Sequence, residues 1–397
     1  MTHRLVLSAV LALGLCAPAG AQESPAEPTS EAGAASTRSP MPFDIIRSLQ
    51  FLQDQVARGN DRAIRVQALL LKRFAPVFLA ADAPVWSDPR NQRAAVLFVL
   101  SGGPAEVLEG LIAADVLPIE DRGLYDGAIA YVRNDVARAR DTLSLVDLSD
   151  MEPGLAGHIN LVLGQLWQED EPERAAGYLD RARLLAPGGL IEEAALRLEV
   201  LIVDGLGRHD QADRLARQYF DRYSASSYSA NFEARFAAIF SARGMGEADK
   251  AMAAMTDVIA GLPAERRRTL LLAVARRALV EGRMAFAHQA AGAALEIGGM
   301  TPADEARARL YHAAAAVGPG DSAGARRALA DIPRDLLHPQ DAALLDAAGN
   351  IVAEIERAPS LLTQISEEPV DGMASPVLDR AERVLGRLNS EFGTQTQ

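Results

Sequence analysis

A recurring spacing constrains the fold of this chain more than any other feature. From about residue 123, a loop residue is followed five positions later by an alanine, and these alanines lie 36 to 39 residues apart. Periods of 20 to 50 residues are typical of solenoids, in which helix pairs stack on one another. A small residue at one fixed place in each second helix lets its partner helix approach closely. We call the line of close contact between paired helices the alanine seam, and its predicted members are Ala139, Ala175, Ala212, Ala248, Ala287 and Ala325. The loop residues that precede them are Asn134, Asp170, Gly207, Arg243, Gly282 and Gly320.

Helical spacing also governs the residues before the repeats. One apolar stripe runs from Ile45 to Val56 and ends at Gly59, a second runs from Leu69 to Phe78, and Asp88-Pro89 is a helix-start signal. No stretch alternates apolar and polar residues over the length of a strand. The sequence therefore predicts an all-α fold. We expect a small N-terminal helical domain at 43–122, followed at 123–334 by a tetratricopeptide-like helical-repeat solenoid that lacks the Trp-Leu-Gly-Tyr signature of that class.

The first residues are typical of a secretory signal peptide. A short basic start precedes an apolar run of about a dozen residues, and small residues at 19–21 form a cleavage site. An apolar run of that length is too short to cross a bilayer, which needs about 20 residues. We therefore predict a signal peptide at 1–21 and a periplasmic mature protein that is not inserted in the membrane.

Both ends of the mature chain differ from its middle. Residues 22–42 offer almost nothing to bury, which predicts a disordered leader. Residues 335–397 carry more acidic than basic side chains, and a helix is expected from Asp341 to Arg357, with a last amphipathic helix built on residues 377–388. This acidic C-terminal helix and tail is either a solvated cap or an acidic docking segment.

Charge and residue chemistry exclude several classes of function. The net charge is −13, and no basic stripe interleaved with aromatic residues occurs, so nucleic-acid binding is not expected. The single cysteine, Cys16, lies in the predicted signal peptide, which leaves no thiolate for a disulfide or a metal site. No two histidines are three or four residues apart, and the HExxH, GxSxG and Walker patterns are absent.

One pair of carboxylates could suggest acid/base chemistry. Glu192 and Glu193 follow a Pro-Gly-Gly turn, at the first turn of an expected helix, where the helix dipole favours negative charge. We read the pair as structural. The sequence thus predicts neither a catalytic site nor a cofactor or metal site, and the chain is not expected to be an enzyme.

Four segments together resemble one protein family. They are residues 47–59 (RSLQFLQDQVARG), the turn at 100–103 (LSGG), residues 182–197 (ARLLAPGGLIEEAALR), and residues 219–232 with their Tyr, Ser, Asn and Phe side chains. Their order and spacing resemble the MotC motility proteins of α-proteobacteria, over about residues 42 to 330. The resemblance implies a periplasmic component of the flagellar motor that binds the periplasmic part of the stator subunit MotB and supports motor rotation. The alternative is a helical-repeat scaffold of the cell envelope that serves secretion or peptidoglycan assembly.

The expected partner-binding residues have side chains that exceed what packing requires. Three are polar positions in the first helix, two are arginines that flank the Pro-Gly turn, and four form a cluster rich in aromatic residues, which are favoured at interface hot spots. For the aromatic cluster, the alternative is that it simply packs a loop over a helix end. The residues are Gln50, Gln53, Asp54, Arg183, Arg197, Tyr223, Tyr228, Asn231 and Phe232.

Overall fold

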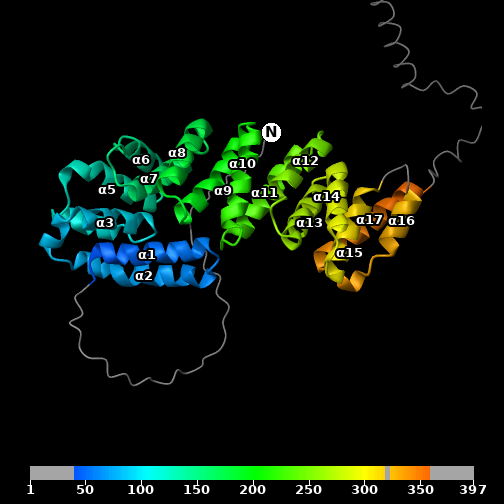
Figure 1. The fold of residues 1–397 in the computed structure, drawn as a ribbon, viewed down its shortest axis with the longest axis horizontal. Coiled ribbons are helices and arrows are strands. Elements are labelled where there is room, and N and C mark those ends of the chain that lie inside the picture. The colour runs from blue at the N-terminus through cyan, green and yellow to red at the C-terminus, as the bar shows by residue number, and fades with distance from the viewer. Residues whose placement is uncertain (1–39, 318–321, 358–397) are drawn as a thin grey trace, which may run out of the picture. The chain divides into compact units, whose positions relative to one another are not determined.

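Residues 40–317 and 322–357 are described by a computed structural model, and within these ranges the chain is helical with no β-strand (Figure 1). The all-α prediction is therefore confirmed. The described residues from Pro42 onward belong to one compact unit. The predicted signal peptide, most of the predicted leader and the helix expected at 377–388 lie outside the described residues.

The N-terminal helices begin and end where local signals place them. Gly59, with φ +93°, ends the first helix, and the Asp88 carboxylate accepts a hydrogen bond from the Arg90 backbone N–H at the start of α3. Gly102, with φ +100°, follows the end of α3 in the predicted helix-to-helix turn. The elements are α1 (Pro42–Ala57), α2 (Asp61–Leu79), the 3₁₀ helix η1 (Ala83–Ser87), α3 (Pro89–Leu100) and α4 (Glu106–Ala113).

Six successive helix pairs follow, consistent with a helical-repeat solenoid (Figure 1). Hydrogen bonds between residues 40 apart, such as Ser241 to Glu281, join neighbouring pairs. After η2 (Ile119–Asp121) the pairs are α5 (Arg122–Val132) and α6 (Val136–Leu143), α7 (Pro153–Trp167) and α8 (Pro172–Leu185), α9 (Leu190–Gly205) and α10 (His209–Tyr223), α11 (Ser229–Arg243) and α12 (Ala248–Ile259), α13 (Ala264–Val280) and α14 (Met284–Ile297), α15 (Pro302–Ala315) and α16 (Ser322–Ala330). The described chain ends with η3 (Arg334–Leu336) and α17 (Pro339–Glu356), which is the helix expected from Asp341 to Arg357.

The predicted alanine seam is present, with one correction of register. The fourth residue of every second helix is a buried alanine: Ala139, Ala175, Ala212, Ala251, Ala287 and Ala325. Ala248, predicted for the fourth pair, is instead the half-buried first residue of α12. The turn explains the difference, because the positive φ that precedes the helix lies at Gly246 (+94°) and not at Arg243, which is still part of α11.

Small residues also let the helices of a pair approach closely from the first helix. A Cβ added to Gly164 of α7 would lie 2.6 Å from the Leu179 side chain of α8, and one added to Gly127 of α5 would lie 2.6 Å from Leu143 of α6. A side chain at either position would have to displace a leucine that is fully buried, so glycine keeps the two helices of each pair close. Two large hydrophobic clusters result, one built from α1 to α7 and one running from α9 to α17.

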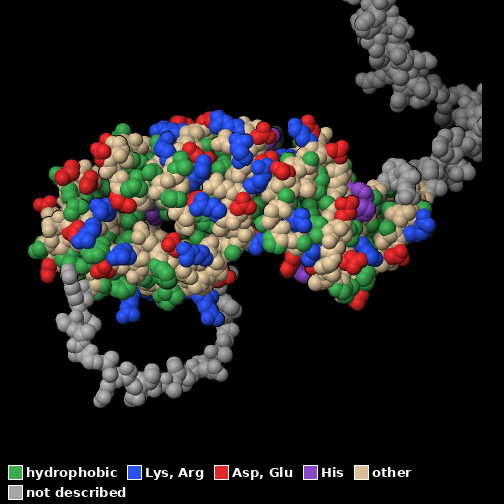
Figure 2. Space-filling view, in the orientation of Figure 1, with side chains coloured by type: hydrophobic (Ala, Val, Ile, Leu, Met, Phe, Trp, Pro, Cys, Tyr) green, Lys and Arg blue, Asp and Glu red, His purple; other side chains and the backbone are tan. Residues whose placement is uncertain are grey.

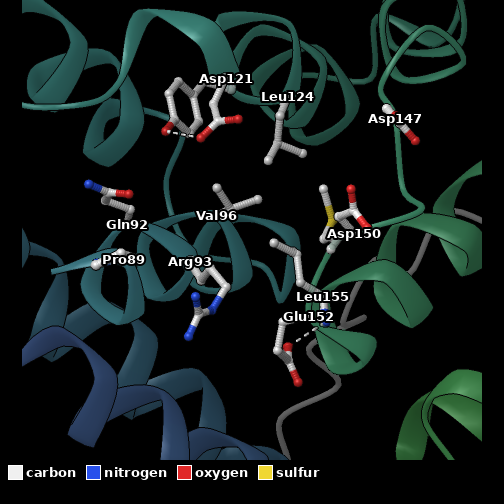
Figure 3. Close-up of a pocket in the computed structure, with 12 residues that line it drawn as sticks. Pro89, Gln92, Arg93, Val96, Asp121, Leu124, Asp147, Asp150, Glu152 and Leu155 are labelled. Atoms are coloured by element: carbon white, nitrogen blue, oxygen red, sulfur yellow. Dashed lines mark hydrogen bonds between the residues drawn. The ribbon is translucent and has the colours of Figure 1, made fainter.

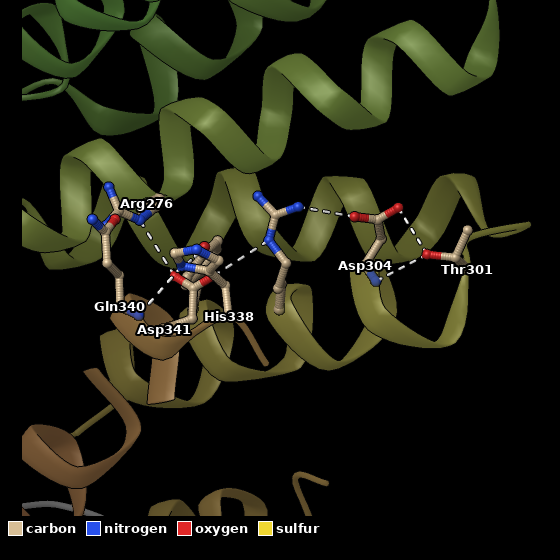
Figure 4. Close-up of polar contacts among 8 residues, drawn as sticks. Arg276, Thr301, Asp304, His338, Gln340 and Asp341 are labelled. Carbon is tan, nitrogen blue, oxygen red and sulfur yellow. Dashed lines mark hydrogen bonds and ion pairs between the residues drawn. The ribbon is translucent and has the colours of Figure 1, made fainter. Parts of the chain in front are cut away.

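A buried carboxylate attaches α17 to the preceding helices (Figure 4). Asp341 accepts a hydrogen bond from the Tyr311 hydroxyl of α15 at 2.8 Å, and it forms ion pairs with Arg276 of α13 at 3.3 Å and Arg307 of α15 at 3.6 Å. Two cations and a hydroxyl thus balance the one buried negative charge. This first helix of the acidic C-terminal segment is part of the folded core.

None of the helices in the described ranges is long and apolar enough to span a membrane.

Because Ala251 is the buried alanine of α12 and Ala248 is only half-buried, the two positions should differ in how well they tolerate a larger side chain. Replacing Ala251 with Leu forces extra atoms into a close-packed seam and should lower the free energy of unfolding by about 1–3 kcal/mol. Ala248→Leu, three residues earlier and half-buried, should change it by less than about 0.5 kcal/mol. Thermal unfolding followed by circular dichroism measures both, and equal losses in the two variants would contradict the register.

Candidate functional site

Three of the four segments that carry the family resemblance contact the fourth, which forms the C-terminal half of α1. Gln53 Nε2 donates a hydrogen bond at 3.2 Å to Ser101 Oγ, in the turn after α3. Asp54 faces the turn between α8 and α9, where a Cβ on Gly189 would lie 2.7 Å from Asp54 Oδ1. Burial raises the pKa of the Asp54 carboxyl, and the nearby Arg58 opposes this rise.

A third turn, between α10 and α11, contacts the end of the same helix. The Ser227 backbone N–H donates to the Val56 carbonyl oxygen at 3.1 Å, and Ala57 belongs to the hydrophobic cluster of α9 and α10. A Cβ on Gly59 would lie 2.2 Å from the Ala225 carbonyl oxygen. We call residues 53–59, together with the turns at 100–103, 187–189 and 224–228, the α1 junction.

Glu192 is buried beside this junction, at the first turn of α9. Its carboxylate accepts hydrogen bonds from the Tyr223 hydroxyl at 2.8 Å and from Gln218 Nε2 at 3.1 Å, and it is paired with Arg222. The Gly188 backbone N–H also donates to it. This is the structural role expected for a carboxylate at a helix N-terminus.

Glu193 is buried with a separate set of partners. It accepts hydrogen bonds from the Tyr219 hydroxyl at 2.8 Å and from Ser226 Oγ at 3.4 Å, and Arg197 Nε lies 3.2 Å away. Burial and the adjacent Glu193 carboxylate raise the pKa of Tyr219, so this phenol stays protonated and can donate. The sequence singled out the pair Glu192-Glu193 correctly but could not show which distant residues satisfy it.

Glu199, two turns further along α9, is less completely satisfied. Its Oε2 accepts a hydrogen bond from Arg183 Nε at 3.2 Å, whereas its buried Oε1 has no hydrogen-bond partner. Burial raises the pKa of Glu199 to about 7, although Arg183 acts in the opposite direction. Arg183 is shared because it also pairs with Asp180. Sequence analysis did not identify Glu199, since a lone acid inside a helix carries no signal of burial.

The predicted partner-binding residues fall into three groups. Gln50 and Asn231 are exposed and Tyr228 is half-buried, with the Arg197 guanidinium 5.1 Å from its ring centroid. Gln53, Asp54, Arg183 and Arg197 are engaged inside the molecule by the contacts described above.

Tyr223 and Phe232 require a correction. Only 3% of Tyr223 and 0% of Phe232 are exposed, and the Phe232 ring lies 3.8 Å from that of Tyr219. Their positions agree with the loop-packing alternative, and they offer no surface to a partner. The aromatic cluster is therefore largely a part of the core, and only its edge, Tyr228 with Asn231, is accessible.

A pocket of ≈ 390 Å³ lies apart from the junction, between α3, α5 and the segment that enters α7 (Figure 3). Leu124, Val96 and Leu155 line it together with four acidic residues: Asp121, Asp147, Asp150 and Glu152. Three of these acids already bind neighbouring groups, namely the Tyr125 hydroxyl, the Ser149 N–H and the first N–H groups of α7. The described residues contain no group of His, Cys, Asp or Glu able to hold a metal ion.

Comparison with known proteins identifies the family. The family model described as Chemotaxis protein MotC matches residues 1–391. The chain belongs to the MotC family. A relative from Rhizobium meliloti (strain 1021), named Chemotaxis protein MotC, is 30% identical over 392 residues, which cover 97% of this chain and 83% of the relative. The predicted resemblance is confirmed, and the match continues well past residue 330, where the four-segment resemblance was expected to end. A MotC family member is a protein related to motility and chemotaxis.

The α1 junction predicts a specific effect of a methyl group at Gly59. Gly59→Ala should lower the free energy of unfolding by about 2–4 kcal/mol, because the new Cβ meets a backbone oxygen and the residue is held at positive φ. Gly207→Ala is the matched control, since Gly207 also has positive φ (+76°) but has open space around its Cβ position. Chemical denaturation measures both variants, and equal losses would show that α1 does not pack on the 224–228 turn.

Glu199 predicts a dependence of stability on pH. Its folded-state pKa of about 7 exceeds its ordinary value of 4.5, so the folded protein retains a proton that the unfolded chain releases. The contribution of Glu199 to the free energy of unfolding is therefore largest at low pH, and it declines as the pH rises from about 4.5 to about 7. Glu199→Gln cannot release this proton, so its free energy of unfolding should not show the decline. Between pH 5 and pH 8, the unfolding free energy of the variant should rise relative to that of the wild type by about 2 kcal/mol.

The control for this measurement is Glu296→Gln, which changes an exposed glutamate of α14. Unfolding free energies of the three proteins are compared at several pH values. Parallel curves for the wild type and Glu199→Gln would show that the Glu199 carboxyl keeps its ordinary pKa.

Proposed function

We propose that this chain is a non-enzymatic, periplasmic component of the flagellar motor, which binds the periplasmic part of the stator subunit MotB and supports motor rotation. The observation that carries the proposal is membership in the MotC family over nearly the whole chain. The signal-peptide pattern at residues 1–21 supports the periplasmic location. A stack of helix pairs supports a binding role, because such stacks present broad surfaces to protein segments.

The interior of the α1 junction supports a narrower choice of contact residues within this proposal. Gln53 and Asp54 of the junction are already engaged, and Tyr223 and Phe232 beside it are buried, so a partner meets only the accessible edge. Gln50 on α1 and Asn231 at the start of α11 flank the junction, and Tyr228 lies in the turn that contacts α1. We propose these three residues as the contact with MotB.

The decisive experiment measures binding of the mature protein to the purified periplasmic domain of MotB. Tyr228→Ala should weaken binding by about 2 kcal/mol, roughly 30-fold, because half-buried tyrosines are frequent interface anchors. Tyr178→Ala is the matched control: Tyr178 on α8 is also half-buried and also lies near an arginine, with Arg181 at 4.8 Å from its ring. Circular dichroism of each variant separates lost binding from lost structure.

Three outcomes would count against parts of this proposal. If the folded wild type does not bind the MotB domain and a deletion strain swims normally, the motor role is wrong and the cell-envelope scaffold remains. If Tyr178→Ala weakens binding as much as Tyr228→Ala, the chosen contact surface is wrong. If a deletion strain loses motility without any binding to MotB, the partner is wrong and the motor role stands.

A further inference from the structure

Helix α2 presents an unusual outer face. Four basic side chains, Arg62, Arg65, Lys72 and Arg73, are exposed along it, and none of them forms an ion pair with a described residue. Spacings of three, seven and one residues place all four within one half of the helix circumference. Asp61 is the only acidic residue of this helix.

Exposed apolar side chains lie among these cations. Leu69 is 67% exposed in the middle of the basic face, and Val66 and Leu79 are 47% and 49% exposed. The opposite face of α2 packs inward, because Leu71, Ala75 and Phe78 are buried in the N-terminal core. Leu79 still packs on α4, where a Cβ added to Gly110 would lie 2.6 Å from its side chain. Leu69 is therefore the apolar side chain that the described fold leaves most accessible on this face.

The charge of this face is opposite to that of the whole chain. The chain carries 53 acidic and 40 basic residues, whereas α2 has four basic residues and one acidic residue. In Figure 1, α2 forms one edge of the folded unit, and Figure 2 shows Lys and Arg side chains projecting at that edge. A partner that approaches this edge meets positive charge with leucine between the cations.

We propose that the outer face of α2 binds an anionic lipid surface peripherally, with Arg62, Arg65, Lys72 and Arg73 on the headgroups and Leu69 inserted between them. Basic side chains near an anionic bilayer are attracted to it, and exposed leucines add apolar burial at the headgroup boundary. A flat surface reaches all of these side chains at once because they project from a single helix at an edge. An acidic protein segment would match the charge but gives no reason for the exposed leucine at its centre.

Co-sedimentation with vesicles tests the proposal on the mature chain. Vesicles of phosphatidylcholine with 30% phosphatidylglycerol should bind the wild type at low salt, and vesicles of pure phosphatidylcholine should not. Each Lys or Arg near an anionic surface contributes about a five-fold gain in binding, so Arg65→Glu combined with Lys72→Glu should reduce partition by about 25-fold or more. Raising the salt concentration should weaken binding by the wild type through screening.

The matched control reverses two exposed arginines on other helices, Arg138→Glu on α6 and Arg214→Glu on α10, for the same change in net charge. This control variant should bind the anionic vesicles as strongly as the wild type does. Leu69→Ser should bind them several-fold more weakly. Equal binding to both kinds of vesicle, no binding of the wild type, or an equal loss in the control would each overturn the proposal. Binding to poly-glutamate without binding to vesicles would also overturn it, in favour of an acidic protein partner.

Discussion

Three carboxylates buried on one helix limit how the middle of this protein can be assembled. Glu192, Glu193 and Glu199 of α9 are 0–1% exposed, and a buried carboxylate is tolerated only when hydrogen bonds or opposite charges compensate it. Their partners come from α8, α9 itself, α10 and the turn after α10. These elements must therefore keep their relative positions, because separating them would leave a charge without compensation in the core. The α1 junction depends on the same turns and is fixed along with them.

The sequence predicts the helices well because their boundaries are encoded locally. Asp88 and Pro89 mark a helix start within two residues, and Gly59 and Gly102 end helices with positive φ values. The repeat is also local, since its period follows from the length of one helix pair. The prediction fails at Ala248 because the segment offers alanine at both 248 and 251, and only burial against the preceding helices distinguishes them.

The candidate site is much harder to predict because its contacts are distant in sequence. The Tyr219 and Tyr223 hydroxyls bond to carboxylates 26 and 31 residues earlier, and no local pattern shows whether a tyrosine points inward or outward. A tyrosine supplies both an apolar ring and a polar tip, so the same residue suits an interface and a core that contains acids. Here the acids decide the outcome, since Glu192 and Glu193 need donors and the tyrosines provide them.

The segments that reveal the family are therefore segments that build the molecule. Five of the expected contact residues are engaged inside the molecule: Gln53, Asp54, Arg183, Arg197 and Tyr223. A likeness carried by these residues therefore reports a shared architecture more directly than a shared interface. Recognition of a partner requires side chains that folding leaves free, such as Asn231 beside the junction and the cations of α2. Because α1 packs against both α2 and the turn that precedes α11, these two accessible surfaces belong to one folded unit. A change that loosens the junction would disturb both surfaces together, whereas a change confined to either surface would leave the core and the other surface intact.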